Sequence, residues 1–198
     1  RFFQHQLRNH PKSQQAIDYL KGRGLSGDIV KRWEIGYAPD EWDAVLKTFG
    51  TDHERIKQLI DLKLVNKNDN GKTYDFFRHR IMFPIRDRRG RVVGFGGRVL
   101  EEGGPKYLNS PETELFSKSN VLYNYARARK NLPRNGNLVV VEGYMDVIAL
   151  HAAGFDNAVA PLGTALTDRQ LELAWKVGPE PVLCFDGDEA GVRAAGRS

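Results

Sequence analysis

The sequence predicts an α/β protein with two parts: a mixed α+β subdomain over residues 1–136, then a parallel-sheet subdomain over residues 137–198. Three observations support this prediction. Short amphipathic segments fill the first sixty residues, a hairpin pattern surrounds residue 90, and apolar runs alternate with helical segments after residue 137. Strand–helix alternation with short connections is typical of a parallel sheet with right-handed crossovers.

Four short helices are expected in the first sixty residues. Ser13 and Ser26 occupy positions suited to N-caps, and Gly22 and Gly50 occupy positions where helices end. Each segment carries apolar residues at helical spacing. These residues are Ala16, Ile17, Leu20, Ile29, Val30, Trp33, Trp42, Val45, Leu46, Phe49, Ile56, Leu59 and Ile60. The spacing places Trp33, Trp42 and, further on, Trp175 in the core.

The middle of the chain reads as a hairpin between loops. Strands over 80–86 and 91–100 are joined by the turn Asp87-Arg-Arg-Gly90. Residues 67–71 and 103–120 read as loops, 121–130 as a helix, and 132–137 as the boundary between the two subdomains.

After the boundary, strands are predicted at 138–141, 158–161 and 182–185, and helices at 146–153, 167–177 and 189–198. Thr167 is the expected N-cap of the second of these helices. Cys184 lies in the third strand and is expected to be packed in the core.

Composition restricts the class of protein. The chain has 198 residues and one cysteine, so an internal disulfide is impossible and a reducing compartment is expected. No apolar run approaches the ~20 residues that span a bilayer, and no signal-peptide pattern opens the chain. A cytoplasmic protein without a membrane partner is expected.

The ends of the chain indicate a piece of something longer. The sequence begins at Arg1 without a methionine and ends at Ser198 inside a predicted helix. We therefore expect the parallel-sheet subdomain to be incomplete at its C-terminal end.

Charge is divided unevenly along the chain. Residues 137–198 contain nine acidic and four basic residues, whereas residues 1–136 carry a net charge of +10. Residues 71–106 alone hold nine basic and four acidic residues. An acidic part joined to a basic part suits a metal-using enzyme that acts on a polyanion. The turn residues Arg86, Arg88, Arg89 and Arg91 fit a simple solvated turn equally well.

Carboxylates follow two of the predicted parallel strands. Glu142 follows the strand at 138–141, and Asp186 and Asp188 follow the strand at 182–185. Ligands of open α/β sheets bind at the carboxyl edge, so these groups are expected to share one crevice. Oxygen ligands without His or Cys suit a hard cation such as Mg2+. Asp146 lies one helical turn after Glu142 and could support them. A lone Asp-x-Asp could also be an ordinary helix cap.

These motifs resemble a known family. Glu142 and Asp186-x-Asp188 after strands resemble the Toprim domain of topoisomerases, primases and some nucleases. The longer segments resemble the bacterial DnaG-type replicative primase family. They are Glu142-Gly-Tyr-Met-Asp-Val147, Pro161-Leu-Gly-Thr164, Phe185-Asp-Gly-Asp188, Arg78-His-Arg-Ile-Met-Phe-Pro-Ile85, Gly90-Arg-Val-Val-Gly-Phe-Gly-Gly-Arg98 and Pro105-Lys-Tyr-Leu-Asn-Ser-Pro-Glu-Thr113.

The resemblance implies synthesis of short RNA primers on single-stranded DNA from ribonucleoside triphosphates. Glu142, Asp186 and Asp188 would be catalytic and would bind Mg2+ or Mn2+, with Asp146 as a supporting carboxylate. A basic surface would bind template and nucleotide, and its members would be Arg23, Arg78, Arg98, Lys106, Tyr107 and Lys118. Tyr107 could also stack on a base.

The family also implies neighbours that this sequence does not contain. A zinc-binding module would precede this region, a further acidic cluster would follow it, and a replicative helicase would bind elsewhere. A monomer at the bacterial nucleoid is expected.

Two alternatives remain open at this point: a Toprim nuclease or topoisomerase, and a non-catalytic nucleic-acid-binding fragment. A dinucleotide-binding site at Gly94-Phe-Gly-Gly97 is rejected, because the fingerprint spacing is incomplete and no helix opens after it.

Overall fold

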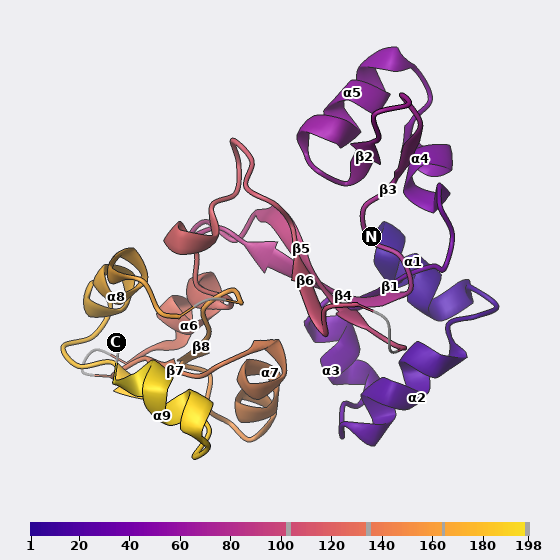
Figure 1. Ribbon diagram of the computed structural model, residues 1–198. Helices are drawn as coiled ribbons and strands as arrows, with labels where there is room; N and C mark the ends of the chain where they lie inside the picture. The colour runs from indigo at the N-terminus through magenta and orange to yellow at the C-terminus, as the bar shows by residue number, and fades with distance from the viewer. Residues whose placement is uncertain (102–103, 134–135, 164, 197–198) are drawn as a thin grey trace. The chain divides into compact units, whose positions relative to one another are not determined.

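The computed structural model describes residues 1–101, 104–133, 136–163 and 165–196 (Figure 1). Parts of three predicted features lie outside the described residues: the loop at 103–120, the boundary segment at 132–137 and the motif ending at Thr164. The last residues of the helix predicted at 189–198 lie outside them as well.

By packing, the chain divides into two compact units. Unit 1 comprises residues 1–84 and 94–116, and unit 2 comprises residues 85–93 and 117–198. The tip of the central hairpin and residues 117–136 therefore pack with the C-terminal unit. A domain boundary between residues 136 and 137 stays a prediction from the sequence.

Unit 1 is a mixed α+β structure, as the sequence predicts. Its helices are α1 (Phe2–Asn9), α2 (Gln14–Gly22), α3 (Gly27–Arg32), α4 (Ala44–Phe49) and α5 (His53–Asp61). Its strands are β1 (Gly36–Ala38), β2 (Val65–Lys67), β3 (Thr73–Asp75), β4 (Arg80–Arg86), β5 (Val92–Val99) and β6 (Tyr107–Asn109), of which β4 and β5 extend into unit 2.

Two sheets organise unit 1. One has the strand order β1-β4-β5-β6, and the other is the antiparallel pair β2-β3. Strand β6 was not expected, because Tyr107–Asn109 falls in a segment that reads as a loop. It pairs with the glycine-rich end of β5, with Arg98 opposite Tyr107. The core of this unit includes Phe3, Val45, Leu59, Phe77 and Met82.

Unit 2 carries the predicted parallel sheet. Its strands β7 (Val139–Val140), β8 (Ala158–Val159) and β9 (Val182–Leu183) form the order β8-β7-β9, and both pairings are parallel. Its helices are η1 (Lys118–Asn120), α6 (Tyr125–Asn131), α7 (Tyr144–Ala152), α8 (Asp168–Trp175) and α9 (Glu189–Ala195). Figure 1 shows α7, α8 and α9 arranged around this sheet.

Helix α6 begins later than the sequence predicts. Tyr123 is extended and pairs with Ala160, its N–H donating to the Ala160 carbonyl at 2.8 Å. Asn124 then turns the chain in the left-handed region, with φ of 67°, and its amide donates to the Ala158 carbonyl at 2.9 Å. Asn is among the few residues that adopt this region readily. The helix therefore starts at Tyr125.

Three buried positions expected from the sequence are exposed. Trp33 is in the core, but Trp42 and Trp175 are 62% and 57% exposed. Cys184 is exposed as well. The strand order explains Cys184, because β9 lies at the edge of the sheet among the described residues and pairs only with β7. A short apolar run does not reveal whether its strand will be central or at an edge.

Local capping signals are correct in most cases. The Ser26 hydroxyl accepts a hydrogen bond from the Ile29 N–H at 3.3 Å, and Thr167 and Gln170 form a reciprocal capping box. Ser13 precedes α2, but its side chain makes no cap bond. Within the described residues, no helix is both long enough and apolar enough to cross a membrane.

Asp75 joins β3 to the start of α4. Its carboxylate is buried and accepts hydrogen bonds from the N–H groups of Val45 at 2.6 Å and Leu46 at 3.1 Å. These N–H groups lie in the first turn of α4, where helix donors need an external partner. Burial raises the pKa of Asp75, and the two N–H bonds oppose this shift.

The raised pKa of Asp75 predicts a pH dependence of stability. The folded state binds the proton more tightly than the unfolded chain, whose carboxyl pKa is about 3.9. The contribution of Asp75 to the free energy of unfolding is therefore complete below that pH and is lost as pH rises through the folded-state pKa. Urea denaturation at several pH values should show the difference between wild type and Asp75→Asn shrinking as pH rises. A difference that grows with pH would contradict this account.

Candidate functional site

Two neighbouring parallel strands bring Glu142 and Asp186 together in unit 2. Strand β7 pairs with β9 in the register Val139 opposite Val182 and Val140 opposite Leu183. Glu142 follows β7 and Asp186 follows β9. The Asp186 N–H donates to Glu142 Oε1 at 2.9 Å. This hydrogen bond directly joins the segments that follow β7 and β9 at the carboxyl edge of the sheet.

Asp188 and Asp146 each hold the start of a helix. Asp188 Oδ1 accepts from the Gly191 N–H at 2.8 Å, in the first turn of α9. Asp146 Oδ2 accepts from the Gly143 N–H at 3.0 Å, at the start of α7. The helix-cap interpretation of Asp-x-Asp therefore holds for one oxygen of Asp188. Its second oxygen makes no hydrogen bond to the described part of the chain.

The three predicted metal ligands are exposed carboxylates without a basic partner. Glu142, Asp186 and Asp188 form no ion pair with any Lys, Arg or His among the described residues. Oxygen donors with uncompensated negative charge suit a hard divalent cation. As placed, however, no three His, Cys, Asp or Glu residues in the described ranges surround a point that could hold a metal. The donor chemistry fits such an ion, and the side chains would have to turn to share one.

Gly191 allows α9 to approach the carboxylate segment. A Cβ atom at this position would lie 2.0 Å from the Asp186 carbonyl oxygen and 2.9 Å from Glu142 Oε1. Gly143 and Gly187, which lie beside the strand-end carboxylates in the sequence, carry no such constraint. At Gly187 no atom lies within 4 Å of the point that a Cβ would occupy, and Gly143 has a φ of −148°, which any residue adopts. The constraint lies at Gly191, which no local pattern marks.

In unit 1, Arg78 rests on an exposed aromatic side chain. Its guanidinium lies 4.0 Å from the centre of the Trp42 ring and 5.5 Å from that of Tyr74. One guanidinium N–H also donates to the Asp75 carbonyl at 2.8 Å. Stacking on an aromatic face orients an arginine without neutralising it. Arg78 therefore presents a fixed positive charge beside an exposed tryptophan.

Arg98 is held in a similar way by two tyrosines. Its guanidinium lies 4.4 Å from the Tyr19 ring centre and 5.5 Å from the Tyr107 ring centre. Its Nε atom is buried and has no hydrogen-bond partner in the described structure. Arg78 and Arg98 thus stack on different aromatic residues.

Lys106 lies in a loop that a buried arginine supports. Lys106 is exposed, and its carbonyl accepts from the Val99 N–H at 3.1 Å. The buried guanidinium of Arg80 donates to the carbonyls of Gly97 and Pro105, both at 3.1 Å. Burial lowers the pKa of Arg80, and the positive charge of Arg78 adds to this effect. Arg80 thus fixes the residue that precedes Lys106.

Arg23 and Lys118 have less defined surroundings. Arg23 is exposed at the C-terminal end of α2 in unit 1, and Lys118 lies in η1 of unit 2. The carbonyl of Lys118 accepts from the side-chain amide of Gln170 at 2.9 Å, and the same amide donates to Val121. Gln170 is fully buried, so it fixes the backbone of η1.

Sequence reasoning missed four residues that shape these surfaces: Tyr19, Trp42, Arg80 and Gln170. Tyr19 and Trp42 appear as ordinary members of amphipathic helices. Arg80 resembles its half-buried neighbour Arg78 in sequence, and only the deeper burial of Arg80 separates them. Gln170 had one signal, its position three residues after Thr167, which marks a capping box.

Comparison with known proteins finds two family matches that together span most of the chain. Residues 2–129 match the family described as DNA primase catalytic core, N-terminal domain, and residues 136–198 match the Toprim domain. The DNA primase of Pseudomonas putida is 52% identical over all 198 residues, and that of Escherichia coli K12 is 48% identical over 197. The segment that carries the parallel sheet and the strand-end carboxylates is thus a Toprim domain, as the sequence predicted.

Solved structures agree with these matches. The crystal structure of a DNA primase domain from Pseudomonas aeruginosa has a TM-score of 0.95 at 49% identity, covering 99% of this chain and 61% of that one. A structure of the DnaG primase catalytic domain bound to ssDNA has a TM-score of 0.90 at 47% identity, with the same coverage. The chain belongs to the DNA primase catalytic core family. It spans about a third of the length of the curated relatives it matches.

Substitution of Gly191 tests whether the fold depends on the close approach of α9 to the Glu142 and Asp186 segments. Gly191→Ala should lower the free energy of unfolding by about 1–3 kcal/mol, because the new methyl group collides with backbone that cannot rotate away. Gly187→Ala is the matched control, since open space surrounds it. Urea denaturation of both variants measures the difference. Equal midpoints would show that α9 does not depend on the close approach.

Proposed function

We propose that this chain is part of a DNA primase that makes short RNA primers on a single-stranded DNA template. The observation that carries the proposal is a sequence identity of about 50% to proteins named DNA primase. The match extends along the whole chain, so it includes the segments that hold Glu142, Asp186 and Asp188. This also favours a primase over the Toprim nuclease or topoisomerase alternatives. A neighbour solved with ssDNA supports the choice of template.

The reaction we propose is nucleotidyl transfer. The 3′-hydroxyl of a ribonucleotide attacks the α-phosphate of an incoming ribonucleoside triphosphate, and pyrophosphate leaves. Bound Mg2+ or Mn2+ would stabilise the charge that develops on the phosphate oxygens. Glu142, Asp186 and Asp188 would hold the ion through their exposed oxygens. The Glu142 contact with the Asp186 backbone keeps the two strand ends adjacent.

The basic residues of unit 1 would bind the polyanion. Arg78 and Arg98 are oriented by aromatic rings rather than by carboxylates, so their charge is available to phosphate groups. Lys106 would add a phosphate contact, and Tyr107 a face on which a base can stack. Arg23 and Lys118 are further candidates for the same role. Asp146 would act indirectly, by holding the start of α7.

Further parts of the proposal come from the family. The protein would act as a monomer in the cytoplasm at the nucleoid. It would meet the replicative helicase through a region outside this chain, and zinc would be confined to a separate module.

One observation favours a second function for the isolated chain, that of a nucleic-acid-binding fragment without catalysis. The described carboxylates are not gathered around one metal position. Binding of single-stranded DNA that is independent of Mg2+, with no primer synthesis, would support this function.

Asp186→Ala tests the proposed catalytic role in the full-length protein. Primer synthesis should fall by at least about 100-fold, because a ligand for the charge-stabilising ion is lost. Affinity for single-stranded DNA, measured by fluorescence anisotropy, should stay within about twofold, since template binding rests on phosphate contacts. Glu172→Ala, an exposed carboxylate of the same unit on α8, serves as control. Near-normal primer yield from Asp186→Ala would refute the assignment.

Lys106→Ala tests the proposed basic surface. Affinity for a single-stranded oligonucleotide should fall, and the slope of log affinity against log salt should decrease by about one, as expected when one phosphate contact is lost. Lys57→Ala provides the matched control, because Lys57 is an exposed lysine on α5 of the same unit. An unchanged slope in the Lys106 variant would exclude a phosphate contact.

A further inference from the structure

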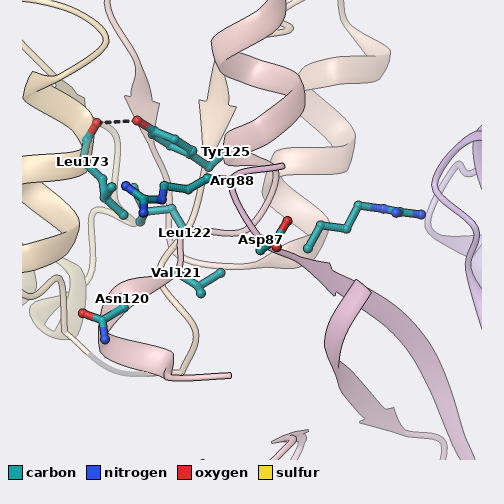
Figure 2. Close-up of a pocket in the computed structure, with 8 residues that line it drawn as sticks. Asp87, Arg88, Asn120, Val121, Leu122, Tyr125 and Leu173 are labelled. Atoms are coloured by element: carbon teal, nitrogen blue, oxygen red, sulfur yellow. Dashed lines mark hydrogen bonds between the residues drawn. The ribbon is translucent and has the colours of Figure 1, made fainter. Parts of the chain in front are cut away.

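A small pocket in unit 2 lies at the turn between β4 and β5. Figure 2 shows its lining residues, which come from the end of β4 and the turn after it, from residues 120–122, and from α6 and α8. They are Arg86, Asp87, Arg88, Asn120, Val121, Leu122, Tyr125 and Leu173. The cavity volume is about 70 Å³. One water needs roughly 10–15 Å³ on this measure, so the pocket has room for a few atoms, not for a whole nucleotide.

The charge of the pocket is positive because its one carboxylate is already engaged. Asp87 accepts a hydrogen bond from Arg91 Nε at 2.7 Å and forms an ion pair with Arg91 Nη2, also at 2.7 Å. It also accepts from the N–H groups of Arg89 and Arg91, both at 2.9 Å. Arg88 makes no ion pair with the described part of the chain. Its charge is therefore not offset by the nearest carboxylate.

Asn120 contributes a second donor to the same pocket. Its Oδ1 atom accepts from Arg169 Nη1 at 3.0 Å, which assigns the other end of the amide as the N–H2 group. That group has no acceptor among the described residues. Arg86 also lines the pocket, and one of its N–H groups donates to the Gly90 carbonyl at 2.6 Å.

The remaining wall of the pocket is apolar, and its polar groups are already hydrogen-bonded. Figure 2 shows Arg88 between Leu122 and Tyr125, with Leu173 beyond them. The Tyr125 hydroxyl donates to the Leu173 carbonyl at 3.0 Å, so both polar groups are engaged with each other. Apolar surroundings strengthen the attraction between an arginine and an anion, because they reduce solvent screening.

We propose that this pocket binds a phosphate group through Arg88 and the Asn120 amide. Arginine is suited to phosphate, because its planar donors match two phosphate oxygens at once. The volume fits one such group. The site is separate in sequence from the strand-end carboxylates, and it gives the arginine-rich turn a role beyond that of a solvated surface.

Two sources could supply the phosphate: the backbone of a nucleic acid, or a free phosphate compound such as pyrophosphate. Phosphate binding at this pocket does not depend on the primase function. It can therefore be tested without primer synthesis.

The turn offers a matched pair of variants. Arg88→Ala removes a pocket residue, whereas Arg89→Ala removes an equal charge from the next position, which does not line the pocket. Pyrophosphate binding by isothermal titration and oligonucleotide binding by anisotropy would be measured on both, without Mg2+. We expect Arg88→Ala to weaken one of the two probes about tenfold, with Arg89→Ala within about twofold of wild type.

The probe that is weakened identifies the source of the phosphate. Equal effects of Arg88→Ala and Arg89→Ala would overturn the proposal, because they would reveal only general surface charge. The proposal would also be overturned if the wild-type protein bound neither pyrophosphate nor the oligonucleotide. Arg88→Lys keeps the charge but loses the paired donors, so it should recover only part of the affinity. Thermal melting of each variant checks folding, which an exposed arginine is not expected to affect.

Discussion

The parallel pairing of β7 with β9 is the constraint on which the carboxylate edge depends. β7 lies at the centre of its sheet, with Val140 fully buried, and β9 extends beside it in fixed register. This register lets the Asp186 N–H meet Glu142 Oε1. Helix α9 can then return close to that contact only because residue 191 lacks a side chain. The negative edge is therefore positioned by backbone geometry, and its carboxylates remain exposed.

Unit 1 uses a different device to present positive charge. Arg78 and Arg98 lie on aromatic rings and not on carboxylates, so they are ordered but keep their charge. A third arginine, Arg80, is buried and donates to two carbonyls. Its role is to hold the loop that carries Lys106. Arg78 and Arg98 thus present positive charge, whereas Arg80 supports a loop. Burial of the Arg80 side chain distinguishes the two roles.

In unit 2, the arginine-rich turn also contains an arginine, Arg88, whose charge is not paired with a carboxylate of the described residues. Asp87 is occupied by Arg91 and by backbone N–H groups, so it shapes the turn instead of cancelling the charge of Arg88. Buried Gln170 fixes the η1 segment from which Asn120 reaches the same pocket. These contacts support the phosphate site that we propose for this pocket.

The sequence by itself determined the features that depend on local chemistry. The Ser26 and Thr167 caps, the strand–helix alternation and the carboxylates at strand ends follow from hydrogen bonds and periodicity within a few residues. The tertiary structure decided what depends on distant neighbours. It placed Cys184 directly after an edge strand, left Trp42 exposed under Arg78, buried Arg80 and left no room for a side chain at position 191. These outcomes depend on which segments pack together, and hydrophobic periodicity shows only that a face will be covered.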